Sequence, residues 1–196
     1  MAVYTKIDKS DIKLINTNFK IEKIISFQGI KQGIENTNYL LKSKNKKFIL
    51  TIFEKRVSNK EVPFFMKLMD KLNSSKINCP KPLRTKSDSY LIKLKKKTAC
   101  IVSFLEGKDK KKLNIKDCYT IGKTTAQMHL VTEKLKLYRK NSMGIKNLNP
   151  LLKSIKFKDN KFSKIVLFLK NNLKNINKYW PKKLPNGIIH GDLFID

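Results

Sequence analysis

The stretch FQGIKQGIENTNYLL, residues 27–41, joins one run of β-forming residues to the next through a turn with two glycines. Gly29 and Gly33 allow the backbone to approach a ligand closely. The turn ends in three short hydrogen-bonding side chains: Asn36, Thr37 and Asn38. Backbone N–H groups in such a turn can cradle a phosphate. An ordinary hairpin loop has the same composition, so this stretch alone leaves both interpretations open.

The residues around this turn predict a β-rich first half. Apolar and β-branched residues predict strands over 21–27, 38–43 and 47–53, and a second hairpin over 90–94 and 98–104. Between the hairpins, Ser58 and Glu61 have the spacing of a capping box and Pro63 suits a first turn. We therefore expect one helix there, with Val62, Phe65, Met69 and Leu72 on its apolar face.

The second half has a helical pattern. Asn114 can cap a helix, and residues 162–180 predict a longer one. The first helix has an expected apolar face of Ile115, Cys118, Ile121, Gly122, Thr125, Ala126 and His129. The second is expected to turn inward Ile165, Phe168, Leu169, Leu173, Ile176 and Trp180. Residues 138–150 read as a looser stretch, and Ile188-Ile189 as the start of a short strand.

Together these elements predict an α+β chain with two lobes. We expect a β-rich lobe with one helix over 1–103, a hinge at 104–107 and a helical region over 108–196.

The formal net charge of +29 comes almost entirely from lysine, because only three of the 44 basic residues are arginine. Proteins that read nucleic-acid bases favour arginine, whose guanidinium binds in a bidentate manner. Lys, Asn and Ile make up 81 of the 196 residues, and the codons of all three are rich in A and T. A solvated lysine surface explains the charge better than a nucleic-acid or membrane partner does.

Three cysteines without a C-x-x-C pair argue against a disulfide framework and against a zinc site. The first residues carry several charges and do not resemble a signal peptide. No apolar run reaches the ~18 residues of a membrane span. These features predict a cytoplasmic protein.

The stretch PNGIIHGDLFID, residues 185–196, holds the residue best suited to catalysis. An Asp in a loop after a buried strand, Asp192, could accept the proton of an attacking hydroxyl. Phosphoryl transfer needs little more there than an aligned nucleophile and metal ions on the phosphates. The alternative is a turn Asp that bonds its own backbone. A third stretch, CIVSFLEG at 100–107, is an extended segment between lobes; its backbone could bind an adenine edge or have no ligand.

The order of these features resembles that of protein-kinase-like folds, and the chain resembles type II homoserine kinases. That family lies in the superfamily of aminoglycoside phosphotransferases and choline kinases. The resemblance runs from residue 1 to residue 196 through these stretches: MAVYT, SFQGIKQGIENTNYLL, FILTIFEKRV, PFFMKLMDKL, CPKPL, IVSFLEGK, IGKTTAQMHL, RKNSMGI and IIHGDLFID.

The resemblance implies a role for several residues. Asp192 would be the catalytic base and His190 would support its loop. Residues Gly33, Asn36, Thr37 and Asn38 would lie over the phosphates of ATP, and the backbones of Ser103 and Leu105 would bind adenine. The substrate would be L-homoserine, phosphorylated to O-phospho-L-homoserine in threonine biosynthesis. His129 is interpreted as a core residue, because a lone His on an apolar helix face is usually structural.

Two departures from the superfamily pattern stand out. The phosphate-binding Lys would align near Thr51 and its Glu partner near Phe65, so both are missing; Lys55 or Arg56 could reach back instead. The resemblance also places the Mg²⁺ ligands after residue 196, with none in 1–196. We therefore expect the sequence to be a fragment, inactive alone, with an apolar surface left exposed on the helix at 162–180.

Two alternatives remain for function. One is another small-molecule kinase of the superfamily, acting on choline, an aminoglycoside or a sugar. The other is a basic, non-catalytic nucleic-acid-binding protein, which would show a steep salt dependence of affinity. Scattered lysines and the absence of a binding motif weigh against it.

Overall fold

The computed structural model describes residues 3–33, 35–54, 58–142, 144–155, 160–181 and 183–195. They form two compact units. The first comprises Met1–Leu137 with Ile188–Asp196, and the second comprises Tyr138–Gly187.

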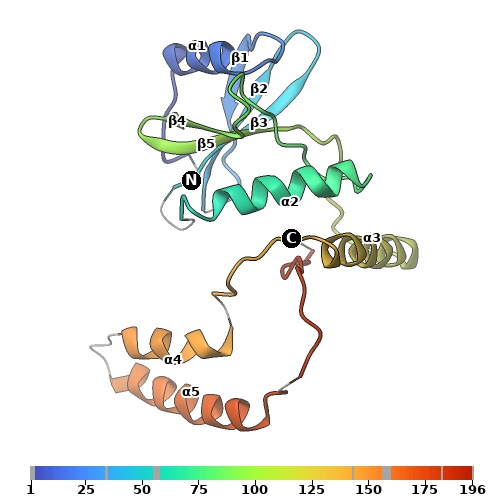
Figure 1. Ribbon diagram of the computed structural model, residues 1–196. Helices are drawn as coiled ribbons and strands as arrows, with labels where there is room; N and C mark the ends of the chain where they lie inside the picture. Colours follow the sequence, from blue (N-terminus) through green and yellow to red (C-terminus); the bar gives the residue numbers. More distant parts are fainter. Residues whose placement is uncertain are drawn as a thin grey trace. The chain divides into compact units, whose positions relative to one another are not determined.

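The first unit is built on a five-stranded antiparallel sheet in the order β1-β2-β3-β5-β4 (Figure 1). The strands are β1 (Ser26–Gly29), β2 (Thr37–Lys42), β3 (Lys47–Ile52), β4 (Leu91–Leu94) and β5 (Lys97–Ser103). This confirms the two predicted hairpins. The first strand, predicted over 21–27, begins five residues later and ends two residues later, at Ser26–Gly29. The side chain of Asn16 binds both the N–H and the C=O of Ile24 and holds that part of the chain outside the sheet.

One face of the sheet packs against helix α1 (Lys9–Asn18). Alternate residues of β2 and β3 point to this face, as a strand period of two requires. Asp8 caps α1 in a capping box with Asp11. The core here consists of the buried residues Ile7, Ile12, Ile15, Phe19, Ile24, Tyr39, Leu41, Phe48, Leu50, Ile52, Leu94, Ala99 and Ile101.

Helix α2 (Val62–Ser74) covers part of the opposite face, over β5 and β4. Val62 and Met66 are buried there, and Phe65 and Met69 are partly buried, so the predicted apolar face is largely confirmed. Pro63 lies in the first turn, as expected. The predicted capping box is wrong, because Ser58 forms a separate turn in which its carbonyl accepts the N–H of Glu61 (2.8 Å).

A polar link also holds α2 to the start of β4. The hydroxyl of Tyr90 donates to Asp70 of α2 (2.7 Å), and Arg84 binds the same hydroxyl at 2.5 Å. The guanidinium of Arg84 stacks on the Tyr90 ring at 4.4 Å and pairs with Asp88 (2.8 Å). Burial, followed by the hydrogen bond to Asp70, raises the pKa of Tyr90, so its hydroxyl stays a donor.

The turn between β4 and β5 requires two left-handed residues. Lys95 and Lys96 have φ values of 47° and 64°, as a two-residue turn of type I′ demands. Lys95 also pairs with Asp8 (2.7 Å) and Asp11 (3.1 Å), which joins this turn to the start of α1.

Helix α3 (Ile115–Glu133) begins at the predicted cap. Asn114 and Asp117 form a reciprocal capping box. The expected apolar face is not a buried one: Ile115 is 90% exposed, and His129, expected in the core, is exposed too. The pattern predicted the helix, but in the described residues little packs on this face beyond the buried Thr132.

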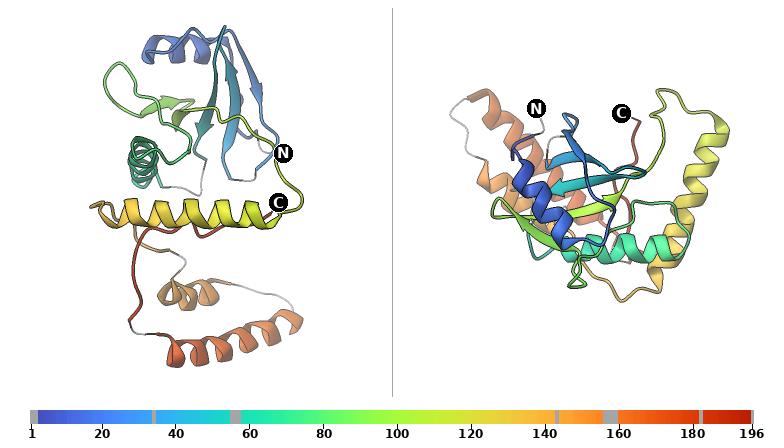
Figure 2. Two further views of the ribbon diagram at one scale, coloured as in Figure 1. Left: turned by 90° about the vertical axis from the view of Figure 1, so that its right-hand side faces the viewer. Right: turned by 90° about the horizontal axis from the view of Figure 1, so that it is seen from above.

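The second unit contains two helices, α4 (Ile145–Ser154) and α5 (Asn160–Tyr179), which lie side by side (Figure 2). Helix α4 was expected to be a loose stretch. Of the residues expected to face inward on α5, Leu173 alone is buried. The others expose between 41% and 66% of their surface, in keeping with the apolar surface expected on this helix.

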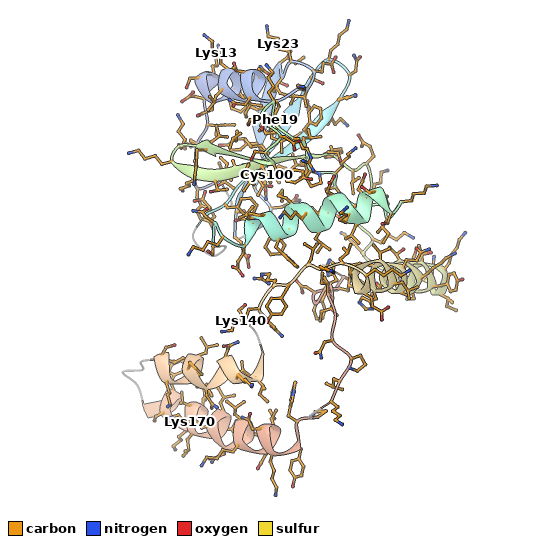
Figure 3. All side chains as sticks on the ribbon, viewed as in Figure 1. Lys13, Phe19, Lys23, Cys100, Lys140 and Lys170 are labelled. Carbon is orange, nitrogen blue, oxygen red and sulfur yellow. The ribbon has the colours of Figure 1, made fainter. Side chains whose placement is uncertain are left out.

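The remaining segment, 183–195, has neither helix nor strand where the structure describes it, so the strand predicted at Ile188-Ile189 is wrong. No partner strand holds it there. Among the described residues, no helix has the length and apolar character needed to cross a membrane. Lysines project from many elements, including the exposed Lys13, Lys23 and Lys170 (Figure 3).

Candidate functional site

The loop between β1 and β2 lies at one end of the sheet. The N–H of Ile30 donates to the carbonyl of Asn38 at 2.9 Å and closes the neck of the loop. Gly33 has a φ of +91°, a conformation that favours glycine, and a Cβ there would meet nothing within 4 Å. This open glycine turn is compatible with phosphate binding by the loop.

A buried polar cluster holds the base of this loop. The hydroxyl of Thr37 accepts the N–H groups of Tyr4 (3.0 Å) and Thr5 (3.1 Å) and donates to Glu54 (2.7 Å). Glu54 also accepts the hydroxyl of Thr5 (2.7 Å) and pairs with Lys97. The side chain of Thr37 is therefore occupied within the fold, so its hydroxyl is not available to a phosphate.

The cluster keeps Glu54 ionised. Burial raises the pKa of its carboxyl, but the hydrogen bonds from Lys97, Thr37 and Thr5 outweigh burial and lower that pKa below its ordinary value. The N–H of Glu54 also contacts the side-chain oxygen of Asn36 at 3.4 Å, so the cluster reaches into the loop itself.

The other face of the sheet carries a different polar pair at the same end. Asn38 and Thr51 lie directly opposite each other on β2 and β3. The hydroxyl of Thr51 donates to Oδ1 of Asn38 at 2.8 Å, and both residues are half-buried. The resemblance implies that the superfamily's phosphate-binding Lys would align near Thr51, and at that position the structure has a neutral pair.

The predicted hinge, 104–107, follows β5 at the end of the sheet opposite the β1–β2 loop. Ser103 is bound on both sides to Lys81: its N–H donates to the Lys81 carbonyl and its hydroxyl accepts the Lys81 N–H, each at 2.9 Å. The N–H of Ser103 is thus occupied, which removes that donor from the expected adenine contact. Leu105 follows with an exposed side chain, and Lys47 pairs with Glu106 (2.8 Å) beside it.

Between the loop and the hinge, part of the sheet face is open. Leu40 and Ile49 are half-buried there, on the same face as Asn38 and Thr51. Ile49 pairs with Val102 next to the hinge, and Thr51 lies two residues further, roughly 7 Å along the strand. This face thus has an apolar strip that runs from the hinge to a polar pair and a glycine loop.

The H-G-D segment belongs to the same unit as the sheet. Gly191 has a φ of +78°, which turns the N–H of Asp192 back toward Nδ1 of His190 at 3.3 Å. Nδ1 accepts this bond, so a neutral His190 carries its proton on Nε2. The carboxylate of Asp192 is exposed.

The donor set of the described residues does not amount to a metal centre. They contain no group of three or more His, Cys, Asp and Glu side chains that could hold an ion. Asp192 supplies one carboxylate, whereas Mg²⁺ takes six oxygen ligands, several of them from water and phosphates. Lys55 and Arg56, the cations expected to replace the missing Lys, lie outside the described residues.

The sequence interpretation missed Thr5, Glu54 and Lys97, which hold the loop base. Their contacts span up to 92 residues of sequence, and no local spacing predicts them. The sequence feature that could have indicated this cluster was a carboxylate, Glu54, shortly after a buried strand.

Comparisons with known proteins identify relatives of the whole chain. The chain is 36% identical to a homoserine kinase of Methylocella silvestris and 37% identical to one of Rhizobium etli, over its full length in both cases. It spans 61% of the length of each of these relatives.

Solved structures support the kinase-like α+β fold. A spectinomycin phosphotransferase in complex with ADP and spectinomycin aligns with 97% of the chain and 64% of its own, at a TM-score of 0.63 and 16% identity. A microcompartment-associated aminopropanol kinase aligns with 74% of the chain and 49% of its own, at a TM-score of 0.57 and 14% identity. The model of the phosphotransferase enzyme family matches residues 26–196, and the chain belongs to that family.

Proposed function

We propose that the protein containing this chain is a homoserine kinase, which transfers the γ-phosphoryl group of ATP to the hydroxyl of L-homoserine in threonine biosynthesis. The observation that carries the proposal is the similarity to homoserine kinases along the whole chain. The division into a β-rich lobe (1–103), a hinge (104–107) and a helical region (108–196) is part of the same proposal. Three free thiols support a reducing, cytoplasmic location.

The open half of the sheet would bind the nucleotide. The structures of a related phosphotransferase with ADP and with AMP support nucleotide use. The backbone around Gly33, Asn36 and Thr37 would lie over the phosphates, and the hinge carbonyls and the N–H of Leu105 would meet the adenine edge. Leu40 and Ile49 would contact the base.

Asp192 would act as the proton acceptor. The homoserine oxygen attacks the γ-phosphorus, the bond from that phosphorus to the bridging oxygen breaks, and ADP leaves. The proton of the hydroxyl passes to the Asp192 carboxylate. His190 would hold the loop through its bond from the Asp192 N–H. Mg²⁺ would shield the phosphate charge when bound, but the described residues contain no group of ligands that could hold it.

The test is an assay of the full-length product of the reading frame that encodes residues 1–196. We expect ADP release with L-homoserine and a phosphate-ester signal in ³¹P NMR. Choline, aminopropanol, spectinomycin and a hexose form the comparison panel. Faster turnover with any of these would reject homoserine as the substrate and retain the phosphotransferase.

Asp192→Asn tests the catalytic base, and we expect kcat to fall by about 10²–10⁴-fold with the KM for ATP little changed. Asp88→Asn is the matched control, since Asp88 is an exposed Asp in the turn before β4 and should leave kcat unchanged. Equal rates for the two variants would remove Asp192 from the mechanism.

A further inference from the structure

The Asn38–Thr51 pair sets the direction of one amide at the open sheet face. An Asn side chain has one acceptor oxygen and one NH₂ group with two donors. Because the Thr51 hydroxyl donates to Oδ1 (2.8 Å), the oxygen faces β3 and the NH₂ group faces away from it. Thr51 thus decides which end of the amide a ligand would meet.

Strand propensity accounts for Thr51 but not for Asn38. Asn is depleted in strands, whereas the neighbouring positions of β2 and β3 carry Tyr39, Leu40, Ile49 and Leu50. Packing in the core does not explain Asn38 at this position either, because Asn38 and Thr51 point to the opposite, half-exposed face of the sheet. The NH₂ group of this directed amide has no partner among the residues that the structure describes, so the arrangement is suited to an acceptor ligand.

The position of the Asn38–Thr51 pair indicates which ligand the amide would bind. Asn38 is the second residue after the glycine loop, and its carbonyl closes the loop neck by accepting the N–H of Ile30 (2.9 Å). The amide therefore lies where the open face meets the neck of the glycine loop. The nearby carboxylate of Glu54 is bound by Lys97 in the cluster at the loop base, so it does not compete for the amide.

We propose that Thr51 is a positioning residue for nucleotide binding: it holds the Asn38 amide so that its NH₂ group donates to a phosphate oxygen of a nucleoside triphosphate. The inference rests on the proposed function. A neutral, oriented donor would then bind the phosphate near the position where the superfamily pattern has a lysine. Thr51 itself touches Asn38 and acts on the ligand only through it.

The experiment measures binding of ATP and ADP by calorimetry, and the KM values for ATP and homoserine, in the full-length protein. Thr51→Val has nearly the same shape but lacks the hydroxyl, and should weaken nucleotide binding and raise the KM for ATP by about 3–10-fold. The KM for homoserine should not change. Thr51→Ser keeps the hydroxyl and should restore wild-type affinity within about 2-fold.

A double-mutant cycle separates positioning from direct contact. If Thr51 acts through Asn38, Thr51→Val should add nothing to the loss already caused by Asn38→Ala. Thr98→Val is the matched control, because Thr98 lies on β5, two strands away from Asn38 in the same sheet, and its hydroxyl accepts Lys93 Nζ (2.9 Å) and has no bond to Asn38. Its nucleotide affinity should equal that of the wild type.

Three results would overturn the inference: wild-type nucleotide affinity in Thr51→Val, additive losses in the double variant, or no nucleotide binding by the wild-type protein. A wild type that binds ATP but does not phosphorylate homoserine would reject the proposed substrate instead. The calorimetric comparison of Thr51→Val with Thr51→Ser would still decide the role of Thr51.

Discussion

Thr37→Val should be among the most destabilising single-atom changes in the sheet. The side chain of Thr37 is fully buried, and its hydroxyl makes three hydrogen bonds at the loop base. Valine keeps the shape and loses all three. The N–H of Thr5, a buried residue, is left without this acceptor at a cost of about 1–3 kcal/mol.

The second cost falls on Glu54. Its carboxylate loses one of its hydrogen bonds, worth about 1.5–3 kcal/mol for a charged acceptor. The extra methyl of valine returns about 1 kcal/mol through apolar burial. Tyr4 is largely exposed, so water can reach its N–H at little cost. The net loss is about 1.5–5 kcal/mol, a large fraction of the stability of an ordinary domain.

Urea unfolding followed by circular dichroism measures this loss, read from the midpoint at constant slope. Trp180 lies in the other unit, so its fluorescence follows that unit separately. Thr51→Val is the matched control, since it removes one hydrogen bond to a neutral amide at a half-buried site and should cost about 1 kcal/mol. A Thr37→Val loss no larger than that of Thr51→Val would refute the reasoning.

Three further outcomes follow from the structure. The folded-state pKa of Glu54 lies below its ordinary value of 4.5, so its contribution to stability is present above pH 4.5 and declines as the pH falls through the lowered value. The difference in unfolding free energy between wild type and Glu54→Gln, measured by urea unfolding, should therefore narrow over that range. Lys96→Gly should raise the free energy of unfolding by about 0.5–1 kcal/mol, because glycine relieves the left-handed conformation at φ 64°; an unchanged urea midpoint would contradict this. Iodoacetamide should label the exposed Cys118 in the native protein, while Cys100, buried with a pKa raised to about 12, reacts after unfolding; mass spectrometry of peptides distinguishes the two.

The sequence predicted the sheet well, because alternation in β2 and β3 is regular and local turns set the register. It also predicted the start of α3 at Asn114, where the cap is a local interaction. It failed for α4, which has Pro150 in its interior, normally a helix breaker. Ile145, Leu148 and Leu152 are half-buried at helical spacing in α4, which packs beside α5, and tertiary packing overrides the local signal.

The site was predictable to the extent that it is local. The glycine turn and the His190–Asp192 bond involve residues close in sequence, and both have the conformation that their glycines favour. The occupied N–H of Ser103 and the cluster around Glu54 depend on partners far along the chain. Pattern reasoning assigns residue types to segments, but it does not show which polar groups the fold has already used.

The contact between Thr5 and Lys97 also sets an order of events during synthesis. The two residues are 92 positions apart, and Lys95 and Asp8 are 87 apart. At about 5–20 residues per second, a ribosome needs roughly 5–20 s to make that length of chain. Hairpins β1–β2 and β2–β3 can pair in the meantime, since they are sequential. Thr5 and Asp8, which are made before every strand of the sheet, therefore reach Lys97 and Lys95 only after most of the sheet has been made.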